Sequence, residues 1–133
     1  KPIGTESNIV QIKADLRISK KSRTANACLA IGDGTDQKKV LKLGVFYSKS
    51  IINIQPVTTP RPIVGKTAKA NIKKGELTSV TATINQSAKT ITFEVNGAKV
   101  SMNFPQQITR ITHVGYASLK TKQECSPLVI TGQ

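Results

Sequence analysis

The stretch Thr90–Phe104, TITFEVNGAKVSMNF, carries the clearest structural signal in the chain. The segments on either side of Asn96-Gly97 both alternate apolar and polar residues. Such alternation gives a β-strand one apolar and one polar face. Asn-Gly tolerates positive φ at both central positions of a type I′ turn, which closes a two-residue hairpin. The stretch therefore predicts a β-hairpin that turns at Asn96-Gly97.

Further alternating or apolar segments lie on both sides of this hairpin. The predicted strands are Val10–Ile18, Ala27–Ile31, Leu41–Tyr47, Ile51–Ile54, Leu77–Ile84, Thr109–Leu119 and Pro127–Thr131. Turn clusters separate them, and the proline-rich stretch Pro56–Pro62 cannot hold an internal strand position. No segment shows three turns of helical periodicity. About nine short strands predict an all-β, two-sheet antiparallel β-sandwich with little or no helix. Residues 1–133 are long enough for one such domain.

The charge balance is strongly basic, with 20 Lys and Arg against 7 Asp and Glu and a net charge of +13. A positive field of this size attracts polyanions. The sequence therefore predicts an acidic polysaccharide or another polyanion as partner, while an acidic protein partner and plain solubility remain alternatives. Nucleic acid is disfavoured, because neither a helix for the major groove nor a set of exposed aromatics for stacking is evident. No apolar run is long enough to cross a membrane, so no membrane association is expected.

The chain contains two cysteines, Cys28 and Cys125. The even count fits a disulfide that would close a long loop in an exported protein, and it fits two separate core thiols equally. No CxxC motif is present, and neither a metal nor a cofactor is expected. The chain begins at Lys1 without a signal-like apolar region. We expect a processed piece of a secreted, periplasmic or cell-surface protein.

Several segments together resemble the concanavalin A-like (laminin G-like, legume-lectin-like) jelly-roll superfamily. They are VQIKADLRI, NACLAIGDG, Thr78–Ile84, Thr90–Val100 with its F-x-V-N-G-x-x-V pattern, ITHVGY at Ile111–Tyr116, and SPLVITG at Ser126–Gly132. The resemblance implies that the last segment finishes beside the first strand and closes the two sheets. The galectin-type H-x-N-x-R and W-x-x-E-x-R patterns are absent, so no binding residues are carried over from the family.

Catalytic constellations are weak in this sequence. Glycoside hydrolysis needs two facing carboxyl groups, and only Asp33 and Asp36 are close in sequence, within a glycine-rich turn. A lyase would need a base and a charge neutraliser. His113 and Tyr116 lie three residues apart, so a regular strand would point them to opposite faces. We therefore expect a chain that is not an enzyme.

Basic clusters supply the candidate binding residues. In the mixed segment Lys66–Glu76, an extended backbone would put Lys69, Asn71 and Lys73 on one face. Lysine attracts sulfates and carboxylates as a mobile point charge, and arginine binds them with two hydrogen bonds. The predicted ligand-binding residues are Arg61, Lys66, Lys69, Asn71, Lys73 and Lys74, with Tyr47 and Tyr116 as aromatic candidates. The predicted function is a non-catalytic carbohydrate-binding module that favours acidic or sulfated polysaccharide. The alternative is a structural or protein–protein interaction module.

Overall fold

The computed structural model describes residues 9–18, 26–34, 37–46, 50–56, 66–72, 76–106, 108–117, 123–125 and 129–131. These residues form strands and one short 3-10 helix, η1 (Gln37–Lys39). The strands are β1 (Ile9–Ile18), β2 (Asn26–Gly32), β3 (Val40–Phe46), β4 (Ile51–Pro56), β5 (Lys66–Lys69), β6 (Thr78–Asn85), β7 (Thr90–Val95), β8 (Ala98–Asn103), β9 (His113–Ala117), β10 (Gln123–Cys125) and β11 (Val129–Thr131). No helix among the described residues is long and apolar enough to span a membrane.

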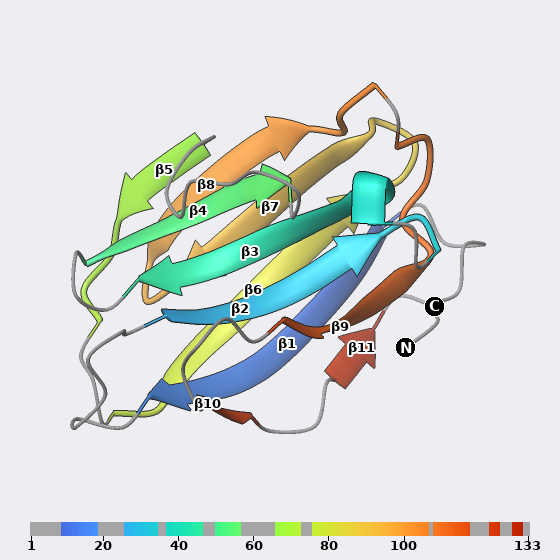
Figure 1. Cartoon of the computed structure of the whole chain (residues 1–133). Helices are drawn as coiled ribbons and strands as arrows, with labels where there is room; N and C mark the ends of the chain where they lie inside the picture. Colours follow the sequence, from blue (N-terminus) through green and yellow to red (C-terminus); the bar gives the residue numbers. More distant parts are fainter. Residues whose placement is uncertain are drawn as a thin grey trace.

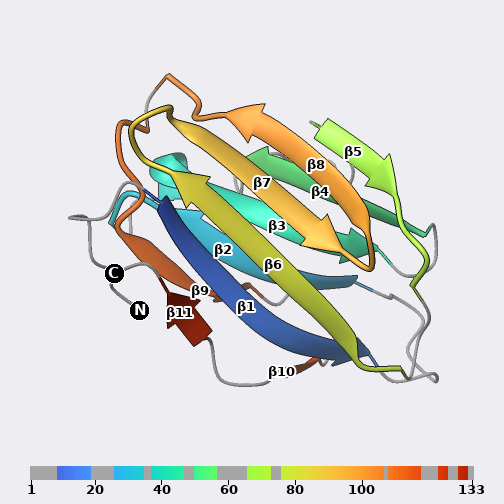
Figure 2. The ribbon, with the colours of Figure 1, turned by 180° about the vertical axis from the view of Figure 1, so that it is seen from behind.

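The strands form two antiparallel sheets packed face to face. A five-stranded sheet has the order β5-β4-β3-β2-β9 and faces the reader in Figure 1. A six-stranded sheet has the order β10-β1-β6-β7-β8, with β11 also paired to β1, and faces the reader in Figure 2. The predicted all-β antiparallel sandwich is therefore confirmed.

The predicted hairpin is confirmed in its register and its turn. Strands β7 and β8 pair from Thr90 with Asn103 to Val95 with Ala98, which leaves Asn96 and Gly97 as the two-residue loop. Their φ angles are 49° and 86°, as the type I′ turn requires.

The end of the chain closes the six-stranded sheet, as the superfamily resemblance implies. Strand β11 pairs antiparallel with the first half of β1, and β10 pairs with its second half. The sequence patterns did not predict β10 as a strand. Strand β1 therefore has partners along both edges, with β10 and β11 on one edge and β6 on the other.

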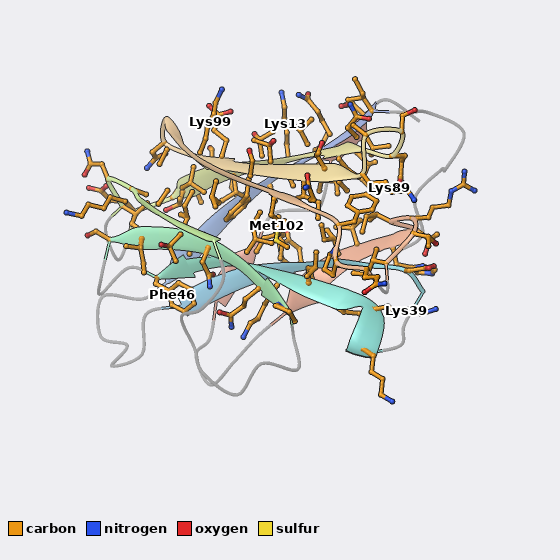
Figure 3. The ribbon with its side chains drawn as sticks, turned by 90° about the horizontal axis from the view of Figure 1, so that it is seen from above. Lys13, Lys39, Phe46, Lys89, Lys99 and Met102 are labelled. Atoms are coloured by element: carbon orange, nitrogen blue, oxygen red, sulfur yellow. The ribbon has the colours of Figure 1, made fainter. Side chains whose placement is uncertain are left out.

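The core lies between the two sheets and follows the predicted alternation. In β1, Val10, Ile12 and Ala14 are buried and the residues between them are not. Phe93 of β7 is fully buried and is among the largest side chains that the six-stranded sheet contributes to the core. Figure 3 shows Met102 between the layers, whereas Lys13 and Lys99 point away from them. The alternation therefore assigns most strand residues to the core or to one of two outer faces.

Candidate functional site

The outer face of the five-stranded sheet is the side turned away from the core. The pairing register places Lys42 of β3 beside Gln55 of β4 and beside Ala30 of β2, and Ala30 beside Gly115 of β9. Because side chains alternate along a strand, these four residues share one row across the outer face. The next row contains Thr67, Asn53 and Gly44.

Polar side chains at the centre of this outer face are buried. Lys42 is 4% exposed, and Asn53 and Gln55 are fully buried. Asn53 Nδ2 donates a hydrogen bond of 2.7 Å to Gln55 Oε1. Lysine is seldom this buried, since removing an ammonium group from water is costly unless an anion or hydrogen bonds compensate. The face therefore holds a largely buried lysine side chain beside a hydrogen-bonded amide pair.

An aromatic ring borders the same polar centre. Phe46 lies on the outer side of β3 (Figure 3) and is only 2% exposed. A Cβ atom placed on Gly44 would lie 2.7 Å from the Phe46 ring and 2.5 Å from Asn53 Oδ1. The ring and the amide group thus close over Gly44, which has no room for a side chain.

A hollow of about 200 Å³ lies beside the polar centre, over β9, β2 and the start of β3. Its lining includes Ala30, Gly32, Val40, His113 and Gly115. A Cβ atom on Gly115 would meet nothing within 4 Å, so the space above this residue is open. Small residues keep the backbone exposed to the hollow, which is the arrangement that lets a ligand approach closely.

A hydrogen-bonded group at the edge of the hollow positions His113. Thr112 Oγ1 accepts a hydrogen bond of 2.7 Å from the backbone N–H of Gly34 and lies 2.9 Å from His113 Nδ1. Gly34 has a φ of +71°, a conformation that glycine adopts without steric cost. The Thr112 backbone N–H donates to Gly32 O at 2.8 Å. The turn after β2 therefore fixes the residues that lead into β9.

A buried glutamine anchors the segment just before His113. Gln86 Nε2 donates to Ile111 O at 2.7 Å, and Ile111 N–H donates to Gln86 Oε1 at 3.1 Å. The side chain thus satisfies both backbone groups of one residue, as a neighbouring strand would. The turn between β6 and β7 is joined in this way to the segment that carries the candidate site.

The predicted ligand residues occupy several places. Lys69 is exposed in β5, opposite Ile51 of β4, and so lies on the same outer face as Lys42. Asn71 is exposed beyond the end of β5, and its carbonyl accepts a 2.8 Å hydrogen bond from Asn96 Nδ2. Lys66 begins β5. Tyr116 is half-buried and packs against the core, on the opposite side of β9 from His113.

Other predicted residues lie outside the part of the chain that the structure describes. They are Arg61, Tyr47, Lys73 and Lys74. Cys28 belongs to β2 and Cys125 to β10, which are strands of different sheets. Their side chains are outside the described set, so the disulfide stays a prediction.

Sequence analysis did not assign Lys42, Asn53, Gln55 or His113 to the binding site. A signal for the first three was present, because Lys42 alternates with Leu41 and Leu43, and Asn53 and Gln55 alternate with isoleucines. Alternation places such residues on the outer face but cannot show that this face is buried. The separation of His113 and Tyr116 onto opposite faces is confirmed.

Among the described acidic residues, Asp33 lies between Gly32 and Gly34, which line the hollow. Asp15 and Glu94 lie on the outer side of the six-stranded sheet, where Asp15 Oδ1 accepts a 2.8 Å hydrogen bond from Ser79 Oγ. No cluster of three or more His, Cys, Asp or Glu side chains is found among the described residues. The outer face of the five-stranded sheet therefore combines the largely buried Lys42, a buried amide pair and open space above Gly115.

Comparisons with known proteins identify the fold. No family model and no curated protein sequence matches the chain. Among solved structures, the chain resembles chicken galectin 2 with 9% identity and a TM-score of 0.67, over 98% of this chain and 97% of that one. It resembles congerin II liganded with lactose and MES with 11% identity and a TM-score of 0.63, over 98% and 100% of the two chains. It also resembles an alginate lyase from Pseudomonas aeruginosa with 16% identity and a TM-score of 0.59, over 96% and 66%. The chain therefore has the concanavalin A-like jelly-roll fold that its sequence resembles.

Proposed function

We propose that this chain is a non-catalytic carbohydrate-binding module that holds an acidic polysaccharide across the outer face of its five-stranded sheet. The observation that carries the proposal is the buried Lys42 side chain beside the Asn53–Gln55 amide pair and an open hollow. An anionic ligand group would form a charge-assisted hydrogen bond with the lysine ammonium group. The amide pair would hold the strands beside Lys42 in place, because fully buried side chains do not contact a ligand.

The fold neighbours support a sugar as the ligand class. One of them, congerin II, is a lactose complex, and another is named as an alginate lyase. The net charge of +13 supports the acidic preference. A module with such a ligand fits the secreted, periplasmic or cell-surface location that we expect for the chain.

The exposed Lys69 extends the proposed face toward one edge of the sheet. It lies on β5, four strands away from His113 on β9. Four strand spacings give a width of about 19 Å, so a chain of several sugar units would be needed to cross the face. Arg61, Lys66, Lys73 and Lys74 remain proposed ligand residues.

The first experiment measures binding to alginate, dextran sulfate, neutral dextran, lactose and DNA over a range of salt concentrations. We expect selective retention of one acidic glycan at about 0.15 M salt, where charges on an open surface are largely screened from distant partners. Equal binding of every polyanion, DNA included, with release at the same salt concentration would show that only charge is recognised. It would leave an acidic protein as the partner to seek.

Two matched lysine variants locate the site. Lys42→Met removes a buried charge from the proposed face, and Lys99→Met removes an exposed one from the opposite side of the molecule. Because a charge-assisted hydrogen bond contributes about 1.5–3 kcal/mol, Lys42→Met should weaken binding at least tenfold. Lys99→Met should change it less than twofold. Equal losses in the two variants would contradict the proposed site.

The absence of catalysis is tested on alginate, because an alginate lyase shares the fold. We expect no unsaturated oligosaccharide products after prolonged incubation, since His113 and Tyr116 lie on opposite sides of β9. Cleavage products that disappear in a His113→Ala variant would overturn the non-catalytic assignment.

A further inference from the structure

The Thr112 hydroxyl group restricts which nitrogen of His113 can carry a proton. A threonine hydroxyl has one proton to donate and two lone pairs to accept with. The Gly34 backbone N–H occupies one lone pair at 2.7 Å. Two acceptors among the described residues are then within reach of the hydroxyl proton, His113 Nδ1 at 2.9 Å and Gly32 O at 3.5 Å.

The two acceptors are not equivalent. An O–H donor forms good hydrogen bonds at 2.5–3.0 Å, so the contact of 3.5 Å to Gly32 O is too long. Gly32 O also accepts the Thr112 backbone N–H at 2.8 Å. Among the described residues, His113 Nδ1 is therefore the better-placed acceptor for the hydroxyl proton. The neutral imidazole then carries its own proton on Nε2, on the side of the ring away from Thr112.

We propose that Thr112 holds His113 as the Nε2–H tautomer, so that the ring presents a hydrogen-bond donor to the hollow and selects ligands with a carboxylate or sulfate oxygen there. The assignment follows from the hydrogen-bond network. It rests on the proposed function, because it names the group on the sugar that the same face binds. Thr112 is the positioning residue and His113 the specificity-determining one.

The surroundings of the ring favour an anionic acceptor. The floor between His113 and Lys42 consists of Ala30, Gly32 and Gly115, which offer no side-chain hydrogen bonds. Lys42 lies on β3 and His113 on β9, with β2 between them. His113 is one row of residues away from the row that contains Lys42 and Ala30. The two donor side chains therefore lie on either side of this floor. A ligand oxygen beside Nε2–H accepts from the imidazole, and its charge is attracted by the Lys42 ammonium group.

The tautomer is measured directly by NMR, because His113 is the one histidine in the sequence. Imidazole ¹⁵N shifts are recorded at alkaline pH, where the ring is neutral. We expect Nε2 to have the shift of a protonated nitrogen in the wild type. Thr112→Val should move both shifts toward the mixture seen in free histidine, and Thr112→Ser should restore them. A wild-type ring protonated on Nδ1 would overturn the proposal.

Glycan binding by two His113 variants tests whether the ring selects a ligand with a carboxylate or sulfate oxygen. In His113→Gln the side-chain amide reaches roughly the place of Nε2, whereas in His113→Asn it reaches roughly that of Nδ1. With alginate as the carboxylate probe and dextran sulfate as the sulfate probe, we expect His113→Gln to keep binding within about threefold of the wild type. His113→Asn and Thr112→Val should lose about tenfold, and Thr112→Ser should recover. The probe that shows this pattern identifies the anionic group.

The possible failures are distinguishable. If the wild type retains one acidic glycan but His113→Gln and His113→Asn bind it equally well, the inference on His113 is wrong and the carbohydrate-binding function stands. If the wild type retains neither alginate nor dextran sulfate, the proposed function and the ligand part of this inference both fail. Unfolding curves of each variant exclude loss of the fold as the cause.

Discussion

The two outer faces of this sandwich carry similar residue types in different environments. On the six-stranded sheet, Lys13 and Lys99 are exposed, and Thr92 Oγ1 and Ser101 Oγ lie 3.0 Å apart in an exposed hydrogen bond. On the five-stranded sheet, Lys42 and Asn53 are buried. The lysine side chains of the first face are in contact with solvent, whereas Lys42 and Asn53 on the second face have almost no exposed surface.

The two faces do not differ in having a hollow, since each carries one of similar volume. A hollow of about 250 Å³ beside Thr90, Ser101 and Asn103 lies on the six-stranded side, and it is no smaller than the one beside His113. The difference lies in what surrounds each hollow. A surface rich in lysine and hydroxyl groups is typical of any soluble sandwich, whereas buried polar groups beside an open floor point to a ligand. Burial therefore separates the two faces, whereas charge and hollow size do not.

The largest expected effect comes from Phe46, which is buried although it lies on an outer face. Phe46→Ala should lower the free energy of unfolding by about 3–5 kcal/mol, as for a core phenylalanine. The matched change on the other face, Thr92→Ala, should cost less than about 1 kcal/mol, because Thr92 loses only an exposed hydrogen bond. Urea unfolding measures both. Equal costs would mean that the two faces do not differ in burial.

Two glycines on the same face should respond in opposite ways. Gly44→Ala brings a methyl group within 2.5 Å of Asn53 Oδ1 and should destabilise the protein by about 1–3 kcal/mol. Gly115→Ala places its methyl group in open space and should change stability by less than about 1 kcal/mol, with a gain where alanine stiffens the strand. Unfolding curves and glycan binding are compared for the two variants.

Glycan binding and stability should respond differently to Gly115→Ala. Gly115→Ala narrows the hollow while the fold remains intact, so we expect weaker glycan binding at unchanged stability. Binding that is unaffected by Gly115→Ala would remove the hollow from the proposed site. Destabilisation by Gly115→Ala as large as that by Gly44→Ala would show that the space above Gly115 is not open.

A smaller effect is expected at the link between the six-stranded sheet and the hollow. Gln86→Leu removes both hydrogen bonds to Ile111 and should cost about 1–2 kcal/mol, because it leaves buried backbone groups without partners. It should also shift the imidazole ¹⁵N resonances of His113, two residues further along. The control is Asn85→Ala, which loses an exposed hydrogen bond to the Ala88 N–H. Unchanged His113 resonances in Gln86→Leu would show that Gln86 does not position the ring.

Most of the fold could be predicted from sequence because its signals are local. Alternation and the Asn96-Gly97 turn act within one or two strands, and the structure confirms both. The short strand β10 was missed, since three residues carry no usable period.

The candidate site could be predicted only in part. Alternation in the Lys66–Glu76 segment predicted a polar side for Lys69, and Lys69 is exposed on the outer face that also carries Lys42. The burial of Lys42 and the hydrogen bond of Thr112 to Gly34, 78 residues earlier, depend on contacts between distant segments. Local periodicity carries no information about such contacts, so the centre of the site became visible only in the structure.

The smallest expected effect tests whether the β5 edge of the binding face depends on the opposite sheet. Asn96 closes the β7–β8 turn, and its Nδ2 donates to Asn71 O at 2.8 Å, just beyond the strand that carries Lys69. Asn96→Gly keeps the positive φ and removes this exposed hydrogen bond, so it should cost about 0.5 kcal/mol and change glycan binding less than twofold. Asn96→Ala should cost about 1 kcal/mol more, because alanine is strained at a φ of 49°. Urea unfolding of the two variants separates the cost of the lost hydrogen bond from the cost of the backbone strain. A loss of binding in Asn96→Gly as large as in Lys42→Met would move the main contacts from the buried centre of the face to its β5 edge, since the hairpin turn contacts that edge and not Lys42.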